Sequence, residues 1–302
     1  MQIQKPETMK QILLIAACVA MAACSHKPVI DVQAHRGGAG LMPENTISAM
    51  KNALDLGVNT LEFDLQLSKD GDVVVSHDNY FHPRYSIRPD GTPVQEDDPK
   101  EYLYTMSYDS IARYEVGLKH VDRWPTQKKI HEVKPLASEL IDASEAYAKE
   151  IGLAPVNYNI EIKSWPGEGE GTLWPDYRVF CDTCVPLLLS KNLGDRLIVQ
   201  CFDTRALNYM HEKWPQLILS YLTEDYDGGD IEALLKNLNF TPQWWSPESS
   251  VVTAENVAWC HKHGIGVVPW TVDDPAEMRR LVDCGVEAII SNYPDILIQT
   301  VR

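Results

Sequence analysis

Hydrophobic and polar residues alternate along the chain with two different periods, and the two periods follow one another regularly. Short runs with a period of two are typical of strands, and the longer stretches between them have the 3.6-residue period of an amphipathic helix. Residues 60–67, for example, place Glu62 and Asp64 on one face of a strand and apolar side chains on the other. The pattern therefore predicts a chain that alternates strands with helices.

About eight strand–helix units are expected. Strands are predicted at residues 32–35, 60–67, 73–75, 157–164, 197–202, 217–222, around 244–245, 266–272 and 288–291. Helices are predicted at residues 44–56, 138–151, 178–189, 205–214, 231–238, 254–262 and 276–284. Strands that alternate with helices of crossover length form parallel sheets, and eight such units in roughly 250 residues fit a closed barrel best. The predicted fold is a single α/β TIM (β/α)8 barrel over residues 31–302.

Residues 79–135 interrupt this pattern with prolines, tyrosines and charged residues. The segment is too aromatic for a disordered linker, so we interpret it as a loop-rich insertion after the second strand–helix region. Long loops in compact domains often carry function, and the insertion is therefore expected to cap the mouth of the barrel.

The first 23 residues have the composition of a targeting segment. An apolar run over residues 12–23 is too short to span a bilayer as a helix, and it ends immediately before Cys24. Small residues before a cysteine resemble the cleavage site of bacterial lipoproteins, whose cysteine is lipidated. We expect a lipoprotein signal peptide at residues 1–23, a lipidated Cys24 and a short tether at residues 24–30. The protein would then be anchored on the non-cytoplasmic side of the bacterial cell envelope, in the periplasm or at the outer membrane.

The composition of the chain argues against some classes of protein and of binding partner. A hydrophobic fraction of 44% excludes a disordered chain. A formal net charge of -16 argues against nucleic-acid binding, because affinity for phosphate backbones depends on Lys and Arg. Cys181 and Cys184 form a CxxC pair, which is open to two interpretations: a disulfide or two ordinary helical cysteines. A zinc site there would need further ligands nearby.

Polar side chains with catalytic or metal-binding potential lie on the predicted strands. Glu62 and Asp64 share one strand face, an arrangement that suits a hard divalent cation such as Mg²⁺ or Ca²⁺. His77 and Asp78 end the next strand. In a TIM barrel, function gathers at the C-terminal ends of the strands. That rule draws attention to His35, Glu62, Asp64, Glu161, Lys163 and Trp270.

Motifs in a fixed order resemble the glycerophosphodiester phosphodiesterase family from about residue 32 to the end of the chain. They are AHRGG at 34–38, PENT at 43–46, EFD at 62–64, KDG at 69–71, HD at 77–78, EIK at 161–163, PWTV at 269–272 and IISNYP at 289–294. Each motif is weak alone, but their number, order and spacing carry the resemblance. Ser291 and Asn292 depart from the threonine and aspartate that are more usual before Tyr-Pro.

The resemblance implies a TIM-barrel enzyme that hydrolyses glycerophosphodiesters to glycerol 3-phosphate and an alcohol with one divalent metal ion. Glu62, Asp64 and Glu161 would bind the Mg²⁺ or Ca²⁺ ion, since hard cations take oxygen ligands. Arg36 and Lys163 would hold the phosphate oxygens. The insertion would shape the choice of leaving group.

The same resemblance makes His35 and His77 the proton-transfer pair, because imidazole titrates near neutral pH. It leaves open which histidine is the base, and whether water or the glycerol 2-hydroxyl attacks. Trp270 would lie against the glycerol end of the substrate. Glu44 is instead interpreted as a first-turn helix residue favoured by the helix dipole. Glycines 37 and 38 are interpreted as room for a ligand to approach the backbone.

Two other functions stay open at this stage. A related metal-dependent phosphodiesterase could use the same barrel for lysophospholipid-type substrates. A non-catalytic lipoprotein could use it as a receptor for glycerophosphodiesters. Binding alone requires neither an acid nor a base, so the pair of histidines argues against the receptor.

Overall fold

The computed structural model describes residues 29–302. The predicted signal peptide and the lipidation site at Cys24 lie outside the described residues, so both stay predictions. Within the described part, no helix is both long enough and apolar enough to cross a bilayer.

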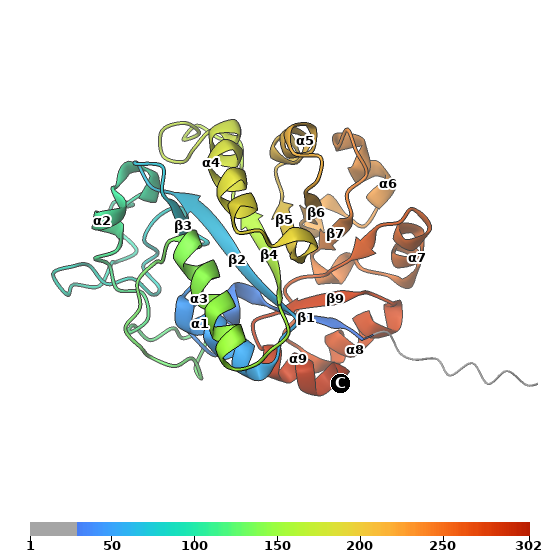
Figure 1. Ribbon diagram of the computed structural model, residues 1–302, viewed down its shortest axis with the longest axis horizontal. Helices are drawn as coiled ribbons and strands as arrows, with labels where there is room; N and C mark the ends of the chain where they lie inside the picture. Colours follow the sequence, from blue (N-terminus) through green and yellow to red (C-terminus); the bar gives the residue numbers. More distant parts are fainter. Residues whose placement is uncertain (1–28) are drawn as a thin grey trace, which may run out of the picture.

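Eight parallel strands of residues 29–302 form a barrel, in the order β8-β7-β6-β5-β4-β2-β1-β9 (Figure 1). They are β1 (Asp31–Ala34), β2 (Thr60–Leu67), β4 (Asn157–Ile162), β5 (Leu197–Cys201), β6 (Ile218–Thr223), β7 (Trp244–Pro247), β8 (Gly266–Val267) and β9 (Ala288–Ser291). Between β8 and β9, backbone hydrogen bonds join Glu287 N to Val267 O at 3.3 Å and Ile290 N to Pro269 O at 3.0 Å. The predicted TIM barrel is thereby confirmed.

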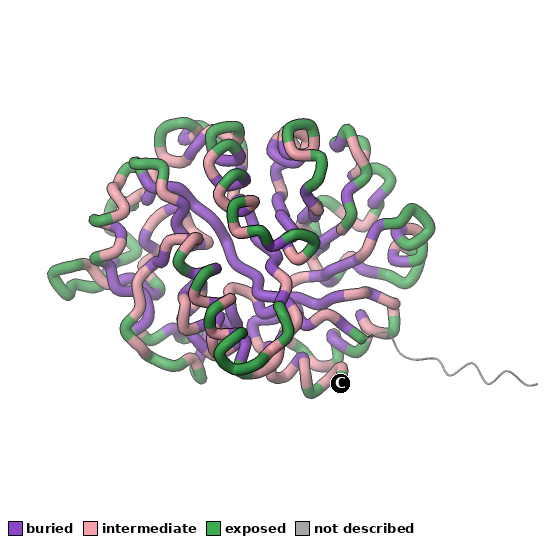
Figure 2. Tube along the Cα trace, viewed as in Figure 1, coloured by how far each residue is buried: buried purple, intermediate pink, exposed green. Residues whose placement is uncertain are grey.

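Helices pack around the outside of the barrel. They are α1 (Ile47–Leu56), α3 (Ala137–Glu150), α4 (Tyr177–Ser190), α5 (Thr204–Lys213), α6 (Ile231–Leu234), α7 (Ala254–Lys262), α8 (Pro275–Cys284) and α9 (Pro294–Val301). Their inner faces are buried and their outer faces exposed, as Figure 2 shows. The main core lies between the helices and the outward strand residues, where Phe63 meets Tyr158 edge to face at 6.5 Å. The inward strand residues are thus free to be polar.

Several predicted element boundaries are wrong, among them the end of the helix predicted at residues 231–238, and helix α9 was not predicted. The helix predicted from residue 44 begins at Ile47, because Asn45 adopts a left-handed φ of 60° that a helix cannot include. Thr46 then caps the helix by accepting a hydrogen bond from Ala49 N at 3.2 Å. The strand predicted over residues 266–272 is only Gly266–Val267.

The insertion at residues 79–135 follows β3 (Val73–Val75), which pairs antiparallel with β2. It includes one short helix, α2 (Tyr108–Ile111), and lies to one side of the barrel in Figure 1. Apolar residues of the insertion form a second core, in which the rings of Phe81 and Tyr114 stack at 3.7 Å. The segment is therefore a packed subdomain, although most of its backbone is irregular.

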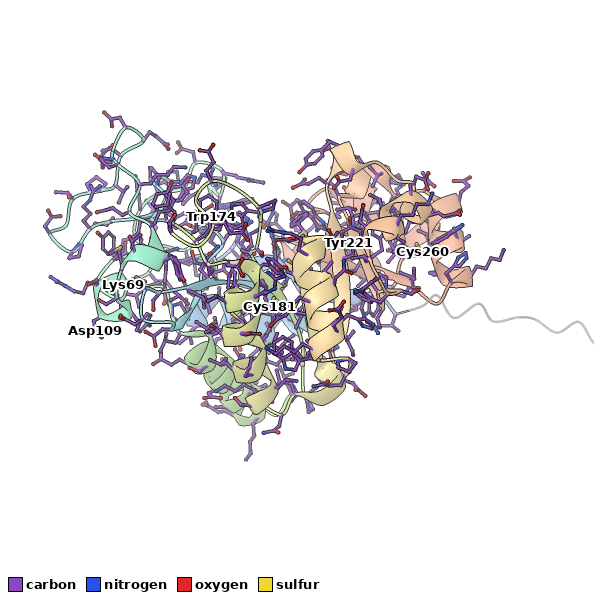
Figure 3. The ribbon with its side chains drawn as sticks, turned by 90° about the horizontal axis from the view of Figure 1, so that it is seen from above. Lys69, Asp109, Trp174, Cys181, Tyr221 and Cys260 are labelled. Carbon is purple, nitrogen blue, oxygen red and sulfur yellow. The ribbon has the colours of Figure 1, made fainter. Side chains whose placement is uncertain are left out.

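The described cysteines are all unpaired. Cys181 and Cys184 are buried and free on α4, and Figure 3 shows Cys181 and Cys260 on separate helices. Of the two interpretations of the CxxC pair, the structure agrees with two ordinary helical cysteines.

Candidate active site

Three buried carboxylates meet where β2 and β4 run side by side. The strand register pairs Asp64 with Glu161, and one oxygen from each of Glu62, Asp64 and Glu161 lies within 4.8 Å of the others. Burial, together with the charge of Asp64, raises the pKa of Glu62 well above its ordinary value. Burial raises the pKa of Glu161 to about 7. Three ionised carboxylates at this spacing would repel one another strongly, which is one reason why the pKa values of Glu62 and Glu161 are raised.

Neighbouring side chains hold two of these carboxylates in place. Gln200 Nε2 donates to Glu62 Oε1 at 2.9 Å, and the backbone N–H of Arg36 donates to Glu62 Oε2 at 2.7 Å. Asn45 Nδ2 donates to Asp64 Oδ2 at 2.8 Å, and Asn45 Oδ1 accepts from Asp64 N at 3.2 Å. Asp64 Oδ1 is buried without any hydrogen-bond partner in residues 29–302. One oxygen of the cluster is thus free to bind a cation.

The loop after β1 carries His35 and Arg36 into the barrel. Arg36 and the next glycine both have left-handed backbone angles, with φ of 53° and 80°. A Cβ atom on Gly37 would lie 2.7 Å from the Cβ of Ala49 on α1. Gly37 is therefore needed for the close approach of helix α1. The interpretation that the glycines make room for a ligand is wrong at this position.

Two cations face the carboxylates. Arg36 Nη1 pairs with Glu44 Oε1 at 2.8 Å, and Arg36 Nε lies 3.4 Å from Asp64 Oδ2. Lys163 Nζ pairs with Glu161 Oε1 at 3.0 Å. Although burial alone would lower the pKa of Lys163, the charges of Glu161 and Asp64 raise it, so the amine stays protonated. Glu44 lies before the helix and orients Arg36, which corrects the prediction that it is a first-turn helix residue.

The two histidines have different partners. His35 Nδ1 lies 2.6 Å from Asn292 Oδ1, whereas His77 Nδ1 lies 3.1 Å from Asp78 Oδ1. The amide of Asn292 is fixed because its Nδ2 donates to Asp273 Oδ2 at 2.8 Å. Asn292 Oδ1 must then accept from His35, which places the proton of His35 on Nδ1 and leaves Nε2 with a lone pair. Burial lowers the pKa of both histidines, with Arg36 adding most for His35.

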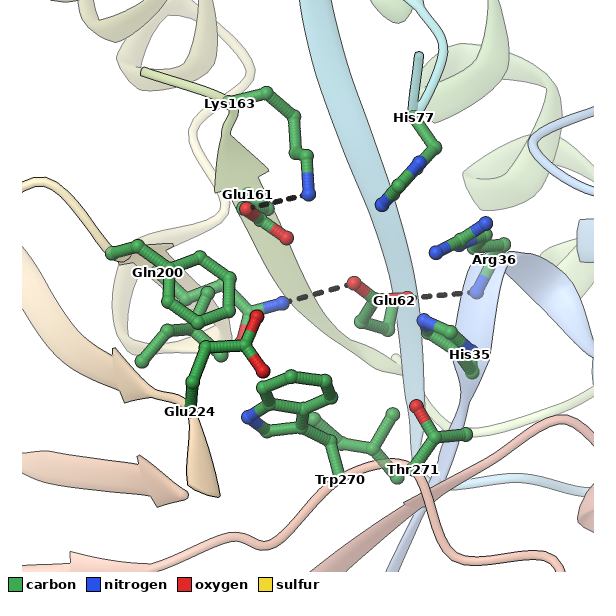
Figure 4. A pocket seen from close by; sticks show the side chains of 13 residues that line it. His35, Arg36, Glu62, His77, Glu161, Lys163, Gln200, Glu224, Trp270 and Thr271 are labelled. Carbon is green, nitrogen blue, oxygen red and sulfur yellow. Dashed lines mark hydrogen bonds and ion pairs between the residues drawn. The ribbon is translucent and has the colours of Figure 1, made fainter. Parts of the chain in front are cut away.

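One pocket at the C-terminal ends of the strands brings most of the predicted site residues together (Figure 4). It is lined by His35, Arg36, Glu62, His77, Glu161, Lys163, Gln200, Phe202, Leu222, Glu224, Trp270, Thr271 and Ile290. None of these residues comes from the insertion. The prediction that residues 79–135 cap the mouth of the barrel does not match this lining.

The sequence matches the model of the glycerophosphoryl diester phosphodiesterase family over residues 35–296. The chain belongs to this family. Its members are phosphoric diester hydrolases, and their shared fold is the barrel described above.

Individual relatives agree with this assignment to the glycerophosphoryl diester phosphodiesterase family. The chain is 30% identical to a glycerophosphodiester phosphodiesterase of Caldanaerobacter subterraneus, over 90% of this chain and 97% of the relative. It is 26% identical to human lysophospholipase D GDPD1, over 86% and 82% of the two chains. The structure of a glycerophosphoryl diester phosphodiesterase homologue from Silicibacter pomeroyi superposes with a TM-score of 0.80 at 27% identity, covering 91% of this chain and 94% of that one.

Aromatic side chains and one carboxylate form part of the pocket wall, which we call the outer wall. Trp270 is held by a hydrogen bond from its Nε1 to Ser246 O at 2.9 Å, and it meets Phe202 edge to face at 5.5 Å. Glu224 also lines the pocket, and burial raises its pKa, helped by the charge of Asp225. Sequence reasoning did not single out Glu224, because nothing in its local sequence distinguishes it from other loop acids.

Asp273 acts on His35 only through Asn292, and this predicts a specific effect of Asp273→Asn. The NH2 group of an asparagine at position 273 would face the Nδ2 of Asn292, and two donors cannot hydrogen-bond to each other. The amide of Asn292 would then rotate and turn its Nδ2 toward His35. The imidazole would then favour the tautomer with its proton on Nε2. We expect kcat to fall about 10-fold to 100-fold with KM little changed, measured by initial rates of phosphodiester hydrolysis. An unchanged kcat would contradict the tautomer assigned to His35.

Proposed function

We propose that the protein hydrolyses glycerophosphodiesters to glycerol 3-phosphate and an alcohol, using one divalent cation and the pair His35 and His77. The observation that carries the proposal is the convergence of both histidines, two cations and the carboxylate cluster at one pocket of a chain that belongs to this family. The names of the relatives support the same substrate class.

The charge balance of the pocket supports a divalent cation. Once ionised, the carboxylates of Glu62, Asp64 and Glu161 outnumber the nearby Arg36 and Lys163, so an anionic phosphate would then meet net negative charge. Asp64 Oδ1 accepts no hydrogen bond within the described residues and lies 4.0 Å from Lys163 Nζ, and the three oxygen donors fit Mg²⁺ or Ca²⁺. When bound there, such an ion would offset charge on a phosphoryl oxygen and lower the pKa of a coordinated hydroxyl.

Residues of the chain would bind the phosphate and transfer the protons. Arg36 and Lys163 are held rigidly by acidic partners on one side and line the pocket on the other, where they can bind the non-bridging phosphate oxygens. His35 carries a free lone pair on Nε2 and so acts as the general base toward the attacking hydroxyl. His77 is backed by the carboxylate of Asp78, which works against the lowering of its pKa by burial, so we assign His77 the role of general acid for the departing alkoxide.

A second substrate class has one observation in its favour. One relative is a human lysophospholipase D, and the outer wall of this pocket presents the apolar side chains of Phe202, Leu222, Trp270 and Ile290. A lysophospholipid carries the same phosphodiester with an acyl chain on the glycerol. The acyl chain would have to extend out of the pocket along this apolar wall.

The experiment that tests the proposal uses a soluble form that lacks residues 1–24. Release of glycerol 3-phosphate is measured from glycerophosphocholine, glycerophosphoethanolamine and glycerophosphoinositol, and lysophosphatidylcholine is assayed in parallel. We expect turnover of the deacylated substrates when Mg²⁺ or Ca²⁺ is present. Turnover of the lysophospholipid alone would reject the first proposal in favour of the second, and turnover of none would reject both.

A further inference from the structure

The loop that carries His77 has little regular structure of its own. His77 lies two residues after the end of the three-residue strand β3, and its ring projects into the pocket beside Arg36 (Figure 4). A proton-transfer group must be held within a few tenths of an ångström to work well. The contacts that hold this histidine must therefore come from outside β3.

One set of contacts reaches His77 through Asp78. The carboxylate of Asp78 uses Oδ1 toward His77 Nδ1 and accepts on Oδ2 a hydrogen bond from the hydroxyl of Tyr85 at 2.9 Å. Tyr85 is only 6% exposed and belongs to the insertion. Burial and the charge of Asp78 raise the pKa of Tyr85 well above its ordinary value, so its hydroxyl keeps its proton and remains a donor. Both oxygens of the Asp78 carboxylate are thereby fixed.

A second set of contacts passes through Ser76. The hydroxyl of Ser76 donates to the backbone carbonyl of Asp78 at 2.6 Å, and it accepts from Lys134 Nζ at 2.7 Å. Because a hydroxyl has one proton, the lysine on one side fixes the direction of the bond on the other. Lys134 thus locks the turn that contains His77.

Lys134 is an unusual residue for its position at the end of the insertion. It is 4% exposed, and within residues 29–302 its amine makes one hydrogen bond and no ion pair. The amine lies 5.6 Å from the ring centre of Phe81 and 5.2 Å from that of Tyr85. Burial lowers its pKa to about 8, so it still carries its charge at neutral pH. A buried cation is costly to stability, and a methionine would fill the same space without that cost.

We propose that Tyr85 and Lys134 are positioning residues for His77, and that the insertion serves to hold the proton-transfer loop from behind. The inference rests on the proposed function, since it assigns His77 a proton-transfer step in phosphodiester hydrolysis. It explains why the insertion is a packed subdomain that reaches Ser76 and Asp78 while contributing no residue to the lining of the pocket.

The test compares two tyrosines of the insertion. Tyr85→Phe removes the hydrogen bond to Asp78, and Tyr114→Phe removes a hydrogen bond of the same length and kind to Glu101, also 2.9 Å. Both rings belong to the same apolar cluster. We expect Tyr85→Phe to lower kcat about tenfold with KM unchanged, and Tyr114→Phe to leave both constants unchanged. Thermal unfolding of the two variants serves to compare their stability.

A double-mutant cycle tests the second set of contacts. Lys134→Met keeps the length of the side chain and removes the charge, and Ser76→Ala removes the group through which the lysine acts. If the lysine acts on His77 through Ser76, the double variant should lose no more kcat than the larger single variant.

A third measurement is independent of catalysis. Nuclear magnetic resonance of ¹⁵N-labelled histidine, assigned with His77→Ala, should show a changed tautomer balance of His77 in Tyr85→Phe and the wild-type balance in Tyr114→Phe. Equal kinetics and spectra for the two tyrosine variants would overturn the inference while an active wild type upheld the proposed function. A wild type inactive on every phosphodiester would instead reject the proposed function, and the spectra alone would then decide the positioning.

Discussion

Replacement of His35 or His77 by alanine is expected to lower kcat for glycerophosphodiester hydrolysis by about 10²-fold to 10⁴-fold. Both rings line the pocket, but neither is a proposed ligand of the cation or a charged partner of the phosphate, so KM should change little. Initial rates of glycerol 3-phosphate release measure the effect. His120→Ala is the matched control, because His120 is an exposed histidine of the insertion outside the pocket. Unchanged turnover in either pocket variant would refute its role.

The His35→Ala and His77→Ala variants should differ in activity when the leaving group of the substrate is changed. A nitrophenyl ester of glycerol phosphate releases a stable anion that needs no proton, whereas an alkyl ester releases an alkoxide that does. His77→Ala should therefore recover most of its activity on the nitrophenyl ester, and His35→Ala should stay slow on both. The reverse pattern would exchange the acid and the base.

The pH dependence follows from the same assignment. Burial and the charge of Arg36 lower the pKa of His35 below its ordinary 6.5. The base works only when deprotonated, so activity rises as pH increases through this lowered pKa. With saturating Mg²⁺ or Ca²⁺, the acidic limb of kcat/KM is expected below pH 6.5, and it should disappear from the profile of His35→Ala.

The barrel was predictable because its signal is repeated along the chain. Each strand–helix unit carries its own periodicity, and the register of a parallel sheet then forces residues such as Asp64 and Glu161 to become neighbours. Boundaries were less predictable where one backbone angle decides them. The left-handed conformation of Asn45 keeps this residue out of helix α1. At the same time, its side chain is hydrogen-bonded to Asp64. A propensity for helix cannot reveal such a long-range contact.

Most charged residues of the site were predictable from the sequence, with Glu224 an exception, whereas its neutral amides were not. Glu62, Lys163 and His77 stand out because such side chains are rarely placed on strand faces without a partner. Gln200 and Asn292 have no such signal, since a buried amide is acceptable anywhere that its hydrogen bonds are satisfied. The role of the insertion was also invisible, because Tyr85 and Lys134 act through folded contacts with Asp78 and Ser76.

Removal of one carboxylate from the cluster should abolish the binding of the divalent cation. Glu161→Gln keeps the size of the side chain but removes one of three charges that lie within 4.8 Å. In the wild type, Mg²⁺ or Ca²⁺ at 100 times its dissociation constant should stabilise the fold by about 2.7 kcal/mol. We expect this stabilisation to vanish in Glu161→Gln, together with hydrolysis. Thermal unfolding with and without the metal, after treatment with EDTA, measures the effect without relying on activity.

Glu224→Gln is the matched control, since Glu224 is a carboxylate that lines the same pocket outside the cluster, and it should keep the full metal-dependent stabilisation. The affinity for the metal should also change with pH in a defined direction. The pKa of Glu161 is raised from 4.5 to about 7, so without metal this carboxyl holds a proton that the unfolded chain has released, and the fold loses stability as pH rises from 4.5 to 7. Metal must displace the proton, so affinity should increase as pH rises through 7. Metal-dependent stabilisation that survived in Glu161→Gln, or was lost in Glu224→Gln, would move the cation site away from the three carboxylates.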